Sequence, residues 1–322
     1  MASARVALTV LFLPPIVLGA VLCAGVAGAG HLGRSSLEWD ILTHFAPIAF
    51  AGGLVAVITG LVLRGWARWL AVIPGAAAVL AAGALMAPEF LRDAGPRAAA
   101  DAPGQLKLIQ FNVWYGSQDH SRTLDWLAAQ DADIIVLQET TPPLRAAIAA
   151  RGLWQVTGEG REVMILSRMP ANRRPLPALD GPAPLAMARF DGPAGDFAVI
   201  GVHYTWPTEV SLQQAQEARV ARLLDGLPRD RAIVAGDFNS TPWSFSRRRW
   251  DREFGLIRRD RALFSWPAVQ SRRAPWLGVV PVLPIDHVYA GAGWATVKVA
   301  RGPRLASDHY PLIVTLAPVA PR

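Results

Sequence analysis

Acidic, amide and imidazole side chains recur where apolar runs begin or end in the second two-thirds of this 322-residue chain. The positions are Asn112, Glu139, His203, Asp237, Asn239, Asp286, Asp308 and His309. A carboxylate at the end of a buried strand costs free energy of desolvation unless it is paired or bound to a metal ion. Because ligands bind at strand ends in many α/β sheets, the pattern predicts that these side chains share one site.

The kinds of side chain in this set favour a hard cation. Glu, Asp and Asn offer oxygen atoms, which suit Mg²⁺ better than Zn²⁺. The single cysteine, Cys23, lies inside an apolar run near the N-terminus. A thiolate zinc site and an intrachain disulfide are therefore both excluded.

Each of these residues, taken alone, also has a structural interpretation. Asn112 could cap a turn, and Glu139 could cap the helix expected after residues 140–143. Asp237 and Asn239 could be turn formers, and Asp308 could be a loop acid. His203 could be a structural histidine held by hydrogen bonds. Their joint occurrence at strand ends favours the functional interpretation.

Short apolar strands and amphipathic helices, which would position these residues, alternate from Leu106 onward. The expected strands are Leu106–Val113, Asp133–Leu137, Glu162–Ser167, Ala186–Phe190, Asp196–His203, Ala232–Phe238, Ile285–Ala290, Thr296–Arg301 and Leu312–Leu316. One helix is expected to begin with Ser121 as its N-cap, and another to span Ser211–Leu227. Their expected inward faces are Leu124, Leu127 and Ala128 in the first, and Leu212, Ala215, Ala218, Val220, Leu223 and Leu224 in the second, with Gln, Glu and Arg outward.

Six short motifs carry the polar residues in a fixed order. They are Phe111-Asn112-Val113-Trp114, Leu137-Gln138-Glu139-Thr140, Gly201-Val202-His203-Tyr204, Gly236-Asp237-Phe238-Asn239-Ser240, Ile285-Asp286-His287 and Ser307-Asp308-His309-Tyr310-Pro311. Together they resemble the motifs of the endonuclease/exonuclease/phosphatase superfamily, also called the DNase I-like fold. The resemblance covers about residues 105–318. It implies an α/β fold, namely a four-layer α/β sandwich of two mixed sheets with helices outside.

The resemblance implies a role for each motif residue in hydrolysis of a phosphate ester. Glu139 would be the principal ligand of Mg²⁺, or alternatively of Mn²⁺, with Asn112 and Asp308 completing the metal site. Asp237 would orient or deprotonate the attacking water, and Asn239 would hold a phosphoryl oxygen. His309 would contact the phosphate and neutralise its charge, and Asp286 would fix the ring of His309. His203 would be a second phosphate contact or a general acid.

Two details of the resemblance stay open. Some members of the superfamily pair the first histidine with a glutamate on the preceding strand. Glu162 is the nearby candidate, although its spacing from Ser167-Arg168 does not match cleanly, and a solvated strand-edge glutamate is the alternative. The first motif also continues as Val113-Trp114-Tyr115, where nucleases often have Asn-Gly, so the nuclease interpretation is less secure.

The substrate class is left open by the motifs, which report only the phosphate and the metal. The formal net charge is +7, and one segment is strongly basic with interleaved aromatic residues. Its members are Arg247, Arg248, Arg249, Arg252, Arg258, Arg259, Arg261, Arg272 and Arg273, with Trp243, Phe245, Trp250, Phe254, Phe264, Trp266 and Trp276. Such a segment suits nucleic acid or a lipid interface. A solvated arginine face over buried aromatics is the alternative.

The first hundred residues are typical of a membrane region. The chain is 52% apolar and only 18% charged, which disfavours an ordinary soluble protein. Three runs, at residues 6–30, 41–63 and 69–88, are long enough to cross a bilayer as helices. The expected domains are a transmembrane region at 1–90, a linker rich in Ala, Pro and Gly at 91–105, and an endonuclease/exonuclease/phosphatase domain at 106–318.

Arginine placement predicts the orientation of these spans. The short loop between the second and third runs contains Arg64 and Arg68 and no acid, so it is expected to be cytoplasmic. The domain after residue 90 would then lie on the extracytoplasmic side of a membrane, expected to be a bacterial inner membrane. The first run could instead be a signal peptide cleaved near Ala27-Gly28-Ala29, and the same side would result.

The sequence thus predicts a membrane-anchored, Mg²⁺-dependent phosphodiesterase, nuclease or phosphatase, of a type found anchored in bacterial membranes. The expected partners are a phosphate-ester substrate, either nucleic acid or a phospholipid head group, and the lipid bilayer. A catalytically inactive, membrane-tethered binding or scaffold module of the same fold is the alternative. Every expected catalytic position holds a chemically competent residue, which favours the enzyme.

Overall fold

The protein forms two compact units in the computed structural model, which describes residues 2–172, 174, 176–177, 179, 184–192, 195–269 and 280–319, with side chains from Leu13 onward. The helical unit comprises Met1–Arg92 and Thr241–Arg248. The sheet unit comprises Asp93–Ser240 and Arg249–Arg322. The chain therefore passes between the units after Arg92, after Ser240 and after Arg248.

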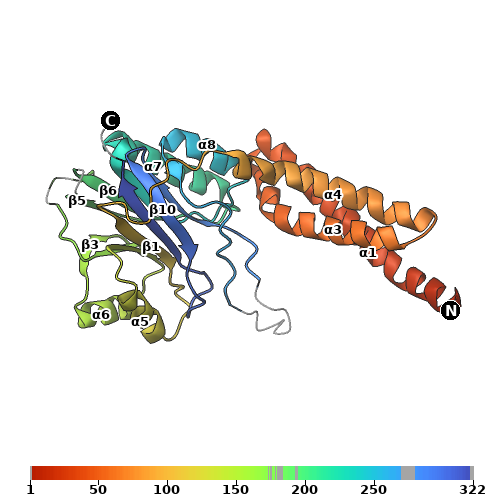
Figure 1. Ribbon diagram of the computed structural model, residues 1–322, viewed down its shortest axis with the longest axis horizontal. Helices are drawn as coiled ribbons and strands as arrows, with labels where there is room; N and C mark the ends of the chain where they lie inside the picture. Colours follow the sequence, from red (N-terminus) through yellow and green to blue (C-terminus); the bar gives the residue numbers. More distant parts are fainter. Residues whose placement is uncertain are drawn as a thin grey trace. The chain divides into compact units, whose positions relative to one another are not determined.

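Three long helices dominate the helical unit and lie side by side (Figure 1). They are α1 Ala2–Gly30, α3 Ala46–Val62 and α4 Trp66–Leu91, and short turns η1 His31–Arg34, α2 Leu37–Asp40 and η2 Ile41–Phe45 join the first two. The stretches Leu13–Arg34, Leu37–Val62 and Trp66–Leu91 are long and apolar enough to cross a membrane. The three predicted apolar helices are thereby confirmed.

Small residues bring these helices together, and large apolar residues face outward. A Cβ atom on Gly53 of α3 would lie 2.7 Å from the carbonyl oxygen of Gly75 in α4, so only glycine permits this crossing. On the outer faces Val62 is 79% exposed and Leu80 72% exposed. Close packing through Gly and Ala with Leu, Ile and Val outside is typical of helices surrounded by lipid.

Two mixed sheets form the sheet unit. The first has the strand order β10-β11-β1-β2-β4-β3 and the second β5-β6-β7-β9-β8. The strands of the first are β10 Trp294–Arg301, β11 Leu312–Pro318, β1 Leu106–Asn112, β2 Ile134–Gln138, β4 Met164–Ser167 and β3 Gln155–Glu159. Those of the second are β5 Leu185–Phe190, β6 Phe197–His203, β7 Ala232–Asp237, β9 Asp286–Ala290 and β8 Ile257–Arg258.

The sheets face each other across an apolar core, and helices cover their outer faces (Figure 1). Leu108 of β1 and Val199 of β6 belong to this central core. Alternate residues of the same strands pack outward, because successive side chains of a strand point to opposite faces. The outer layers are α5 Ser121–Ala129 and α6 Pro142–Arg151 on the first sheet, and α7 Val210–Asp225 with the end of α8 Phe245–Phe254 on the second. This is the predicted four-layer sandwich.

Strand ends coincide at one edge of each sheet. β1 and β2 are parallel, with Asn112 opposite Gln138, the residue before Glu139. β6 and β7 are also parallel, with His203 opposite Asp237, and Asp237 is in turn opposite Asp286 of the antiparallel β9. The pairing registers therefore place the polar motif residues next to one another.

Two helix predictions were wrong in detail. Ser121 is not the N-cap of α5; it is the first helical residue, and its backbone N–H donates to Asp119 Oδ1 at 2.8 Å. In α7 the residues expected to face inward include Leu212 and Ala215, yet both are exposed. Buried polar residues stand there instead, namely Gln213, Gln216 and Glu217. They turn inward because backbone groups beside this helix need hydrogen-bond partners. For example, Gln216 Oε1 accepts the backbone N–H of Thr205.

Candidate active site

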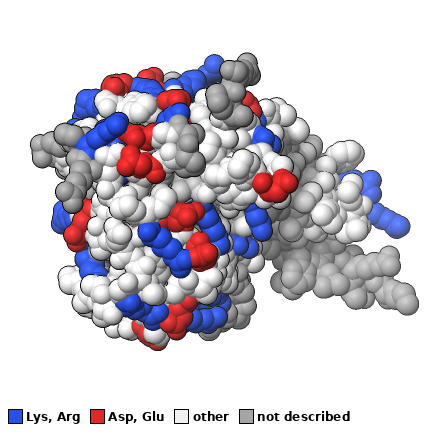
Figure 2. All heavy atoms as spheres, turned by 60° about the vertical axis from the view of Figure 1, so that its left-hand side comes forward, with Lys and Arg blue, Asp and Glu red and all other residues white. Residues whose placement is uncertain are grey.

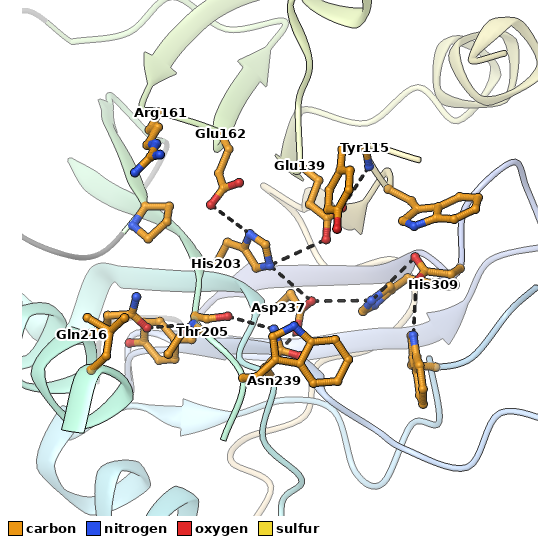
Figure 3. A pocket seen from close by; sticks show the side chains of 17 residues that line it. Tyr115, Glu139, Arg161, Glu162, His203, Thr205, Gln216, Asp237, Asn239 and His309 are labelled. Atoms are coloured by element: carbon orange, nitrogen blue, oxygen red, sulfur yellow. Dashed lines mark hydrogen bonds and ion pairs between the residues drawn. The ribbon is translucent and has the colours of Figure 1, made fainter. Parts of the chain in front are cut away.

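A cavity of about 340 Å³ opens at the shared edge of the two sheets (Figure 3). Six predicted site residues line it, namely Glu139, His203, Asp237, Asn239, Asp308 and His309. Asn112 and Asp286 are fully buried and contact these six from behind. The structure therefore brings all eight predicted residues together in one place.

His309 forms a buried pair with Asp286. Its Nδ1–H donates to Asp286 Oδ2 at 2.7 Å, while Nε2 lies 3.6 Å from Asp237 Oδ2. Burial alone would lower the pKa of His309, but the charges of Asp286 and Asp237 outweigh burial and raise it to about 10. An imidazolium is therefore fixed at the cavity wall at neutral pH.

Asp237 lies between both histidines. Burial raises the pKa of Asp237 to about 6, although His309 opposes the rise. Its Oδ1 accepts the backbone N–H of Asn239 at 2.8 Å, and Asn239 Nδ2 donates to the carbonyl of Tyr204 at 2.8 Å. The turn-forming interpretation of these two residues is thus confirmed, and their functional roles stay a prediction.

Glu139 is held by two donors. Oε1 accepts from Asn112 Nδ2 at 2.9 Å, and Oε2 accepts the backbone N–H of Tyr115 at 2.9 Å. Its alternative role as a helix cap was wrong, because Thr141 caps α6 through its own side chain. The carboxylate of Glu139 is instead directed into the cavity.

Three non-glycine residues of the site have left-handed backbone conformations. The φ angles are 60° at Trp114, 58° at Glu139 and 46° at Asn239. Side chains other than Asn, Asp and Gly rarely adopt this region, and such conformations persist where the surroundings enforce them. The hydrogen bonds to Asn112, Tyr115 and Asp237 supply that enforcement here.

His203 faces the cavity between acidic partners. Its Nδ1 lies 3.3 Å from Glu162 Oε1, and its Nε2 lies 3.8 Å from both Glu139 Oε1 and Asp237 Oδ2. Burial would lower the pKa of His203, but the Glu162 carboxylate beside Nδ1 and the other nearby negative charges outweigh burial and raise this pKa. The residue left open by the sequence, Glu162, is therefore the partner of His203.

The donor set fits a divalent cation. Glu139 and Asp308 both face the cavity, and the buried Oδ1 of Asp308 has no hydrogen-bond partner among the described residues. Burial raises the pKa of Asp308, although the charge of His309 and the hydrogen bond from Trp266 Nε1 to Oδ2 at 3.3 Å oppose the rise. Asn112 presents its amide nitrogen to Glu139, while its oxygen accepts the backbone N–H of Trp114 at 3.0 Å. In this arrangement Asn112 orients the carboxylate.

A second cluster could also hold a metal by geometry alone. Asp237, Asp286 and His309 each bring a ligand atom within 4.8 Å of the others. The charges of these three already compensate in part, because the His309 imidazolium stands between the two carboxylates. The buried carboxylate oxygen that lacks a hydrogen bond among the described residues is instead Oδ1 of Asp308.

Aromatic side chains around the cavity were not predicted as part of the site. The lining includes Trp114, Tyr115, Trp206 and Trp266, with Arg161 beside them. Tyr115 is 69% exposed and Trp206 is 61% exposed. The signal that could have found them is position, because Trp114 and Trp206 follow the strand-end motifs by two or three residues.

Part of the basic segment is buried, while Arg252 and Arg261 are exposed. Arg247, Arg258 and Arg259 are buried, and Arg259 donates to the carbonyls of Ala290 and Gly291 at 3.0 and 2.7 Å. On the face in Figure 2, cationic and acidic residues are interspersed. Arg272, Arg273 and Trp276 lie outside the described residues. The three buried arginines serve structure because internal carbonyl and carboxylate groups need donors.

Comparisons with known proteins agree with this geometry. The profile of the Endonuclease/Exonuclease/phosphatase family matches residues 109–309, which include all eight site residues. A protein of that family from Bacteroides thetaiotaomicron is similar in structure, with a TM-score of 0.51 and 16% identity over 66% of this chain and 97% of that one. D. rerio TDP2 complexed with a single strand DNA product has a TM-score of 0.50 and 17% identity over 66% and 98%. Among curated proteins, none matches the sequence significantly.

Proposed function

Because the chain belongs to the endonuclease/exonuclease/phosphatase family, we propose that it is a membrane-anchored, divalent-metal-dependent phosphoester hydrolase. The observation that carries this proposal is the convergence of two acid-paired histidines and the unpartnered oxygen of Asp308 on one cavity. Phosphoryl transfer needs mainly positioning and neutralisation of charge on the phosphoryl oxygens. Imidazolium groups and a cation at one cavity wall would supply both.

The chain's own residues would divide the work as follows. His309, protonated through Asp286 and Asp237, would donate a hydrogen bond to a phosphoryl oxygen and stabilise the charge that develops there. Asp237, with a pKa of about 6, is largely deprotonated at neutral pH and would accept the proton of the attacking water. Asn239, fixed by Tyr204, would hold a phosphoryl oxygen with its second amide N–H.

His203 would protonate the leaving oxygen. Its raised pKa keeps the ring protonated in a larger fraction of molecules near neutral pH, and Glu162 fixes its orientation through Nδ1. The Nε2 atom is then free to face the group that departs. This arrangement places acid and base on neighbouring strand ends, because His203 and Asp237 are register partners.

Glu139 and Asp308 would hold the divalent cation, with Asn112 fixing the Glu139 carboxylate. A bound cation would polarise the phosphoryl group and lower the pKa of water. Carboxylate oxygen ligands favour Mg²⁺, with Mn²⁺ as the alternative.

The helical unit would be the membrane anchor. Its three stretches are long and apolar enough to cross a bilayer, and Arg64 and Arg68 lie in the loop between α3 and α4. By the positive-inside rule that loop would be cytoplasmic and the sheet unit extracytoplasmic, at a bacterial inner membrane. A periplasm-active phosphatase reporter fused after Arg322 should be active, whereas activity of a cytoplasm-only reporter would contradict this orientation.

The aromatic side chains around the cavity indicate which kinds of substrate it could bind. Tyr115 and Trp206 offer exposed flat apolar faces beside the phosphate site, and Trp206 meets Trp266 edge to face at 6.4 Å. Such faces suit an ester whose alcohol carries a base or an acyl chain. Nucleic acid and phospholipid head groups therefore remain the two substrate classes to compare.

The test uses the full chain in detergent with Mg²⁺ and a panel of plasmid DNA, RNA, sphingomyelin and bis-p-nitrophenyl phosphate. Hydrolysis of at least one substrate should require Mg²⁺ and stop with EDTA. Glu139→Ala should lower the rate by several orders of magnitude, and Arg161→Ala, at the rim, should leave hydrolysis of the small diester largely intact. Metal-independent hydrolysis, or full activity of Glu139→Ala, would contradict the proposed site.

An inactive scaffold of the same fold is the competing function. It would show no hydrolysis of any substrate in the panel, and Mg²⁺ would fail to raise its thermal stability. The presence of competent residues at all eight positions favours the hydrolase.

A further inference from the structure

The chain makes an unusual excursion directly after the catalytic loop. Asp237, Asn239 and Ser240 belong to the sheet unit, but Thr241–Arg248 pack with the helices, and the chain returns at Arg249. An anchor needs only one connection, which the passage from Arg92 to Asp93 already supplies. The second connection therefore calls for a separate explanation.

Asp40, in the turn between α1 and α3, binds the start of this excursion's helix. Its Oδ1 accepts the backbone N–H of Phe245 at 2.8 Å, and its Oδ2 accepts that of Ser246 at 2.7 Å. These are the first two residues of α8, so Asp40 caps a helix about two hundred residues downstream. Asp40 is only 5% exposed, and a buried carboxylate is costly unless such donors compensate it.

A histidine one turn after Asp40 forms a hydrogen bond with Thr241, the first residue of the excursion. His44 Nδ1 shares a hydrogen bond of 2.7 Å with Thr241 Oγ1, and His44 is also buried. Thr43 Oγ1 donates to the carbonyl of Asp40 at 2.5 Å and fixes the turn that carries both residues. A Cβ atom on Gly33 would lie 2.7 Å from Asp40 Cα, so glycine is needed for this close approach.

The sheet unit holds the preceding residues equally firmly. Asn239 is bound to Asp237 and Tyr204, and the carbonyl of Ser240 accepts from His287 Nε2 at 2.9 Å. Only the peptide bond between Ser240 and Thr241 separates these contacts from the contact with His44. Displacement of Thr241 would therefore be transmitted to Asn239 and Asp237 within two to four residues.

We propose that Asp40 and His44 are positioning residues for the active site, acting through Thr241–Arg248 on the loop that carries Asp237 and Asn239. The helical unit is then part of the catalytic architecture as well as an anchor. This inference rests on the proposed hydrolase function. It predicts a loss in the rate of the chemical step, because small displacements of a catalytic group lower turnover more than they weaken binding.

The experiment compares Asp40→Ala, Asp40→Asn, His44→Ala and Thr241→Val with the wild-type full chain in detergent, using bis-p-nitrophenyl phosphate and Mg²⁺. Asp40→Ala should lower kcat roughly 10- to 100-fold with KM changed less than about threefold. Asp40→Asn keeps one acceptor oxygen and should recover part of the rate. Glu38→Gln is the matched control, because Glu38 is an exposed acid two residues away whose carboxylate accepts a hydrogen bond from Ser36 in the same turn.

Thermal unfolding separates positioning from a loss of fold. If Asp40→Ala does not fold, Thr241→Val removes the hydroxyl bound to His44 at nearly constant volume and should still lower kcat several-fold. Wild-type kcat in folded Asp40→Asn, His44→Ala and Thr241→Val would overturn the inference while leaving the hydrolase function intact. Absence of activity in the wild-type chain would instead contradict the proposed function itself.

Discussion

Strand β9 carries two aspartate–histidine pairs of the same chemistry in opposite settings. Asp286 points to His309, whose Nε2 faces Asp237 at the cavity. The next residue, His287, points to the other face, where Nδ1 binds Asp260 Oδ2 at 2.7 Å and Nε2 binds the carbonyl of Ser240. Both histidines are buried, but His287 has both ring nitrogens engaged. The comparison suggests a rule to test, namely that such a pair can take part in catalysis only where one ring nitrogen faces the cavity.

The largest expected contrast is in activity. His309→Asn should lower kcat by about 10² to 10⁴-fold, the usual contribution of a positioned acid–base group. His287→Asn should lower it far less, because His287 is not among the residues that line the active-site cavity and instead binds Asp260 and the carbonyl of Ser240. Steady-state rates with bis-p-nitrophenyl phosphate measure both. Equal losses would erase the distinction between the pairs.

The second contrast concerns folding stability. Here the larger effect is expected at the Asp260–His287 pair. Asp260→Ala should reduce the free energy of unfolding by about 3 kcal/mol, because it leaves His287 buried without its carboxylate and removes one of the two carboxylates beside the buried Arg258. His309→Asn should cost less, since Asp237 lines the cavity and burial raises its pKa to about 6, so this carboxylate can take up a proton. Denaturant unfolding of the two variants gives the ranking, and a more stable Asp260→Ala protein would reverse it.

A third contrast concerns the change in folding stability on binding Mg²⁺. It compares the proposed metal ligands at the cavity with Asp260 of the buried pair. Saturating Mg²⁺ at about 100 times its dissociation constant should add about 2.7 kcal/mol of stability. The gain should vanish in Glu139→Gln and Asp308→Asn and persist in Asp260→Asn. Thermal unfolding with Mg²⁺ and with EDTA tests this, and an unchanged gain in Asp308→Asn would place the ion elsewhere.

The smallest contrast is in acid sensitivity. Burial would raise the pKa of Asp260, but His287 and Arg258 outweigh burial and hold it below its usual 3.8. The ionised Asp260 therefore stabilises the fold above pH 3.8, and this contribution is lost as the pH falls through its lower folded value. The stability difference between wild type and Asp260→Asn should shrink below pH 3.8. A difference that is constant from pH 6 to pH 3 would show that Asp260 contributes no charge-dependent stability.

The sequence predicted best what depends on local pattern. The nine expected strands are present within a few residues, because alternating apolar runs specify them. β3 and β8 were missed, since β3 is half exposed and contains Gly158, while β8 has two residues inside a basic segment. The apolar helices followed directly from hydropathy.

Contacts between distant segments could not be predicted from one sequence. Nothing near Arg259 in the chain indicates that the carbonyls of Ala290 and Gly291 would bury it. Asp40 likewise looks like a loop acid until the backbone of Ser246 is placed beside it. The motif order predicted which residues meet at the site, but the partner of His203 required coordinates.

The excursion of Thr241–Arg248 also bears on whether proteolysis could release the sheet unit from the helical unit. Many anchored domains are shed when a protease cuts one stalk. A cut between residues 93 and 105 would leave this protein attached, since Thr241–Arg248 would still be held by Asp40 and His44. A fragment that begins near residue 100 would also carry that segment without its partners, so soluble release and full turnover should be incompatible.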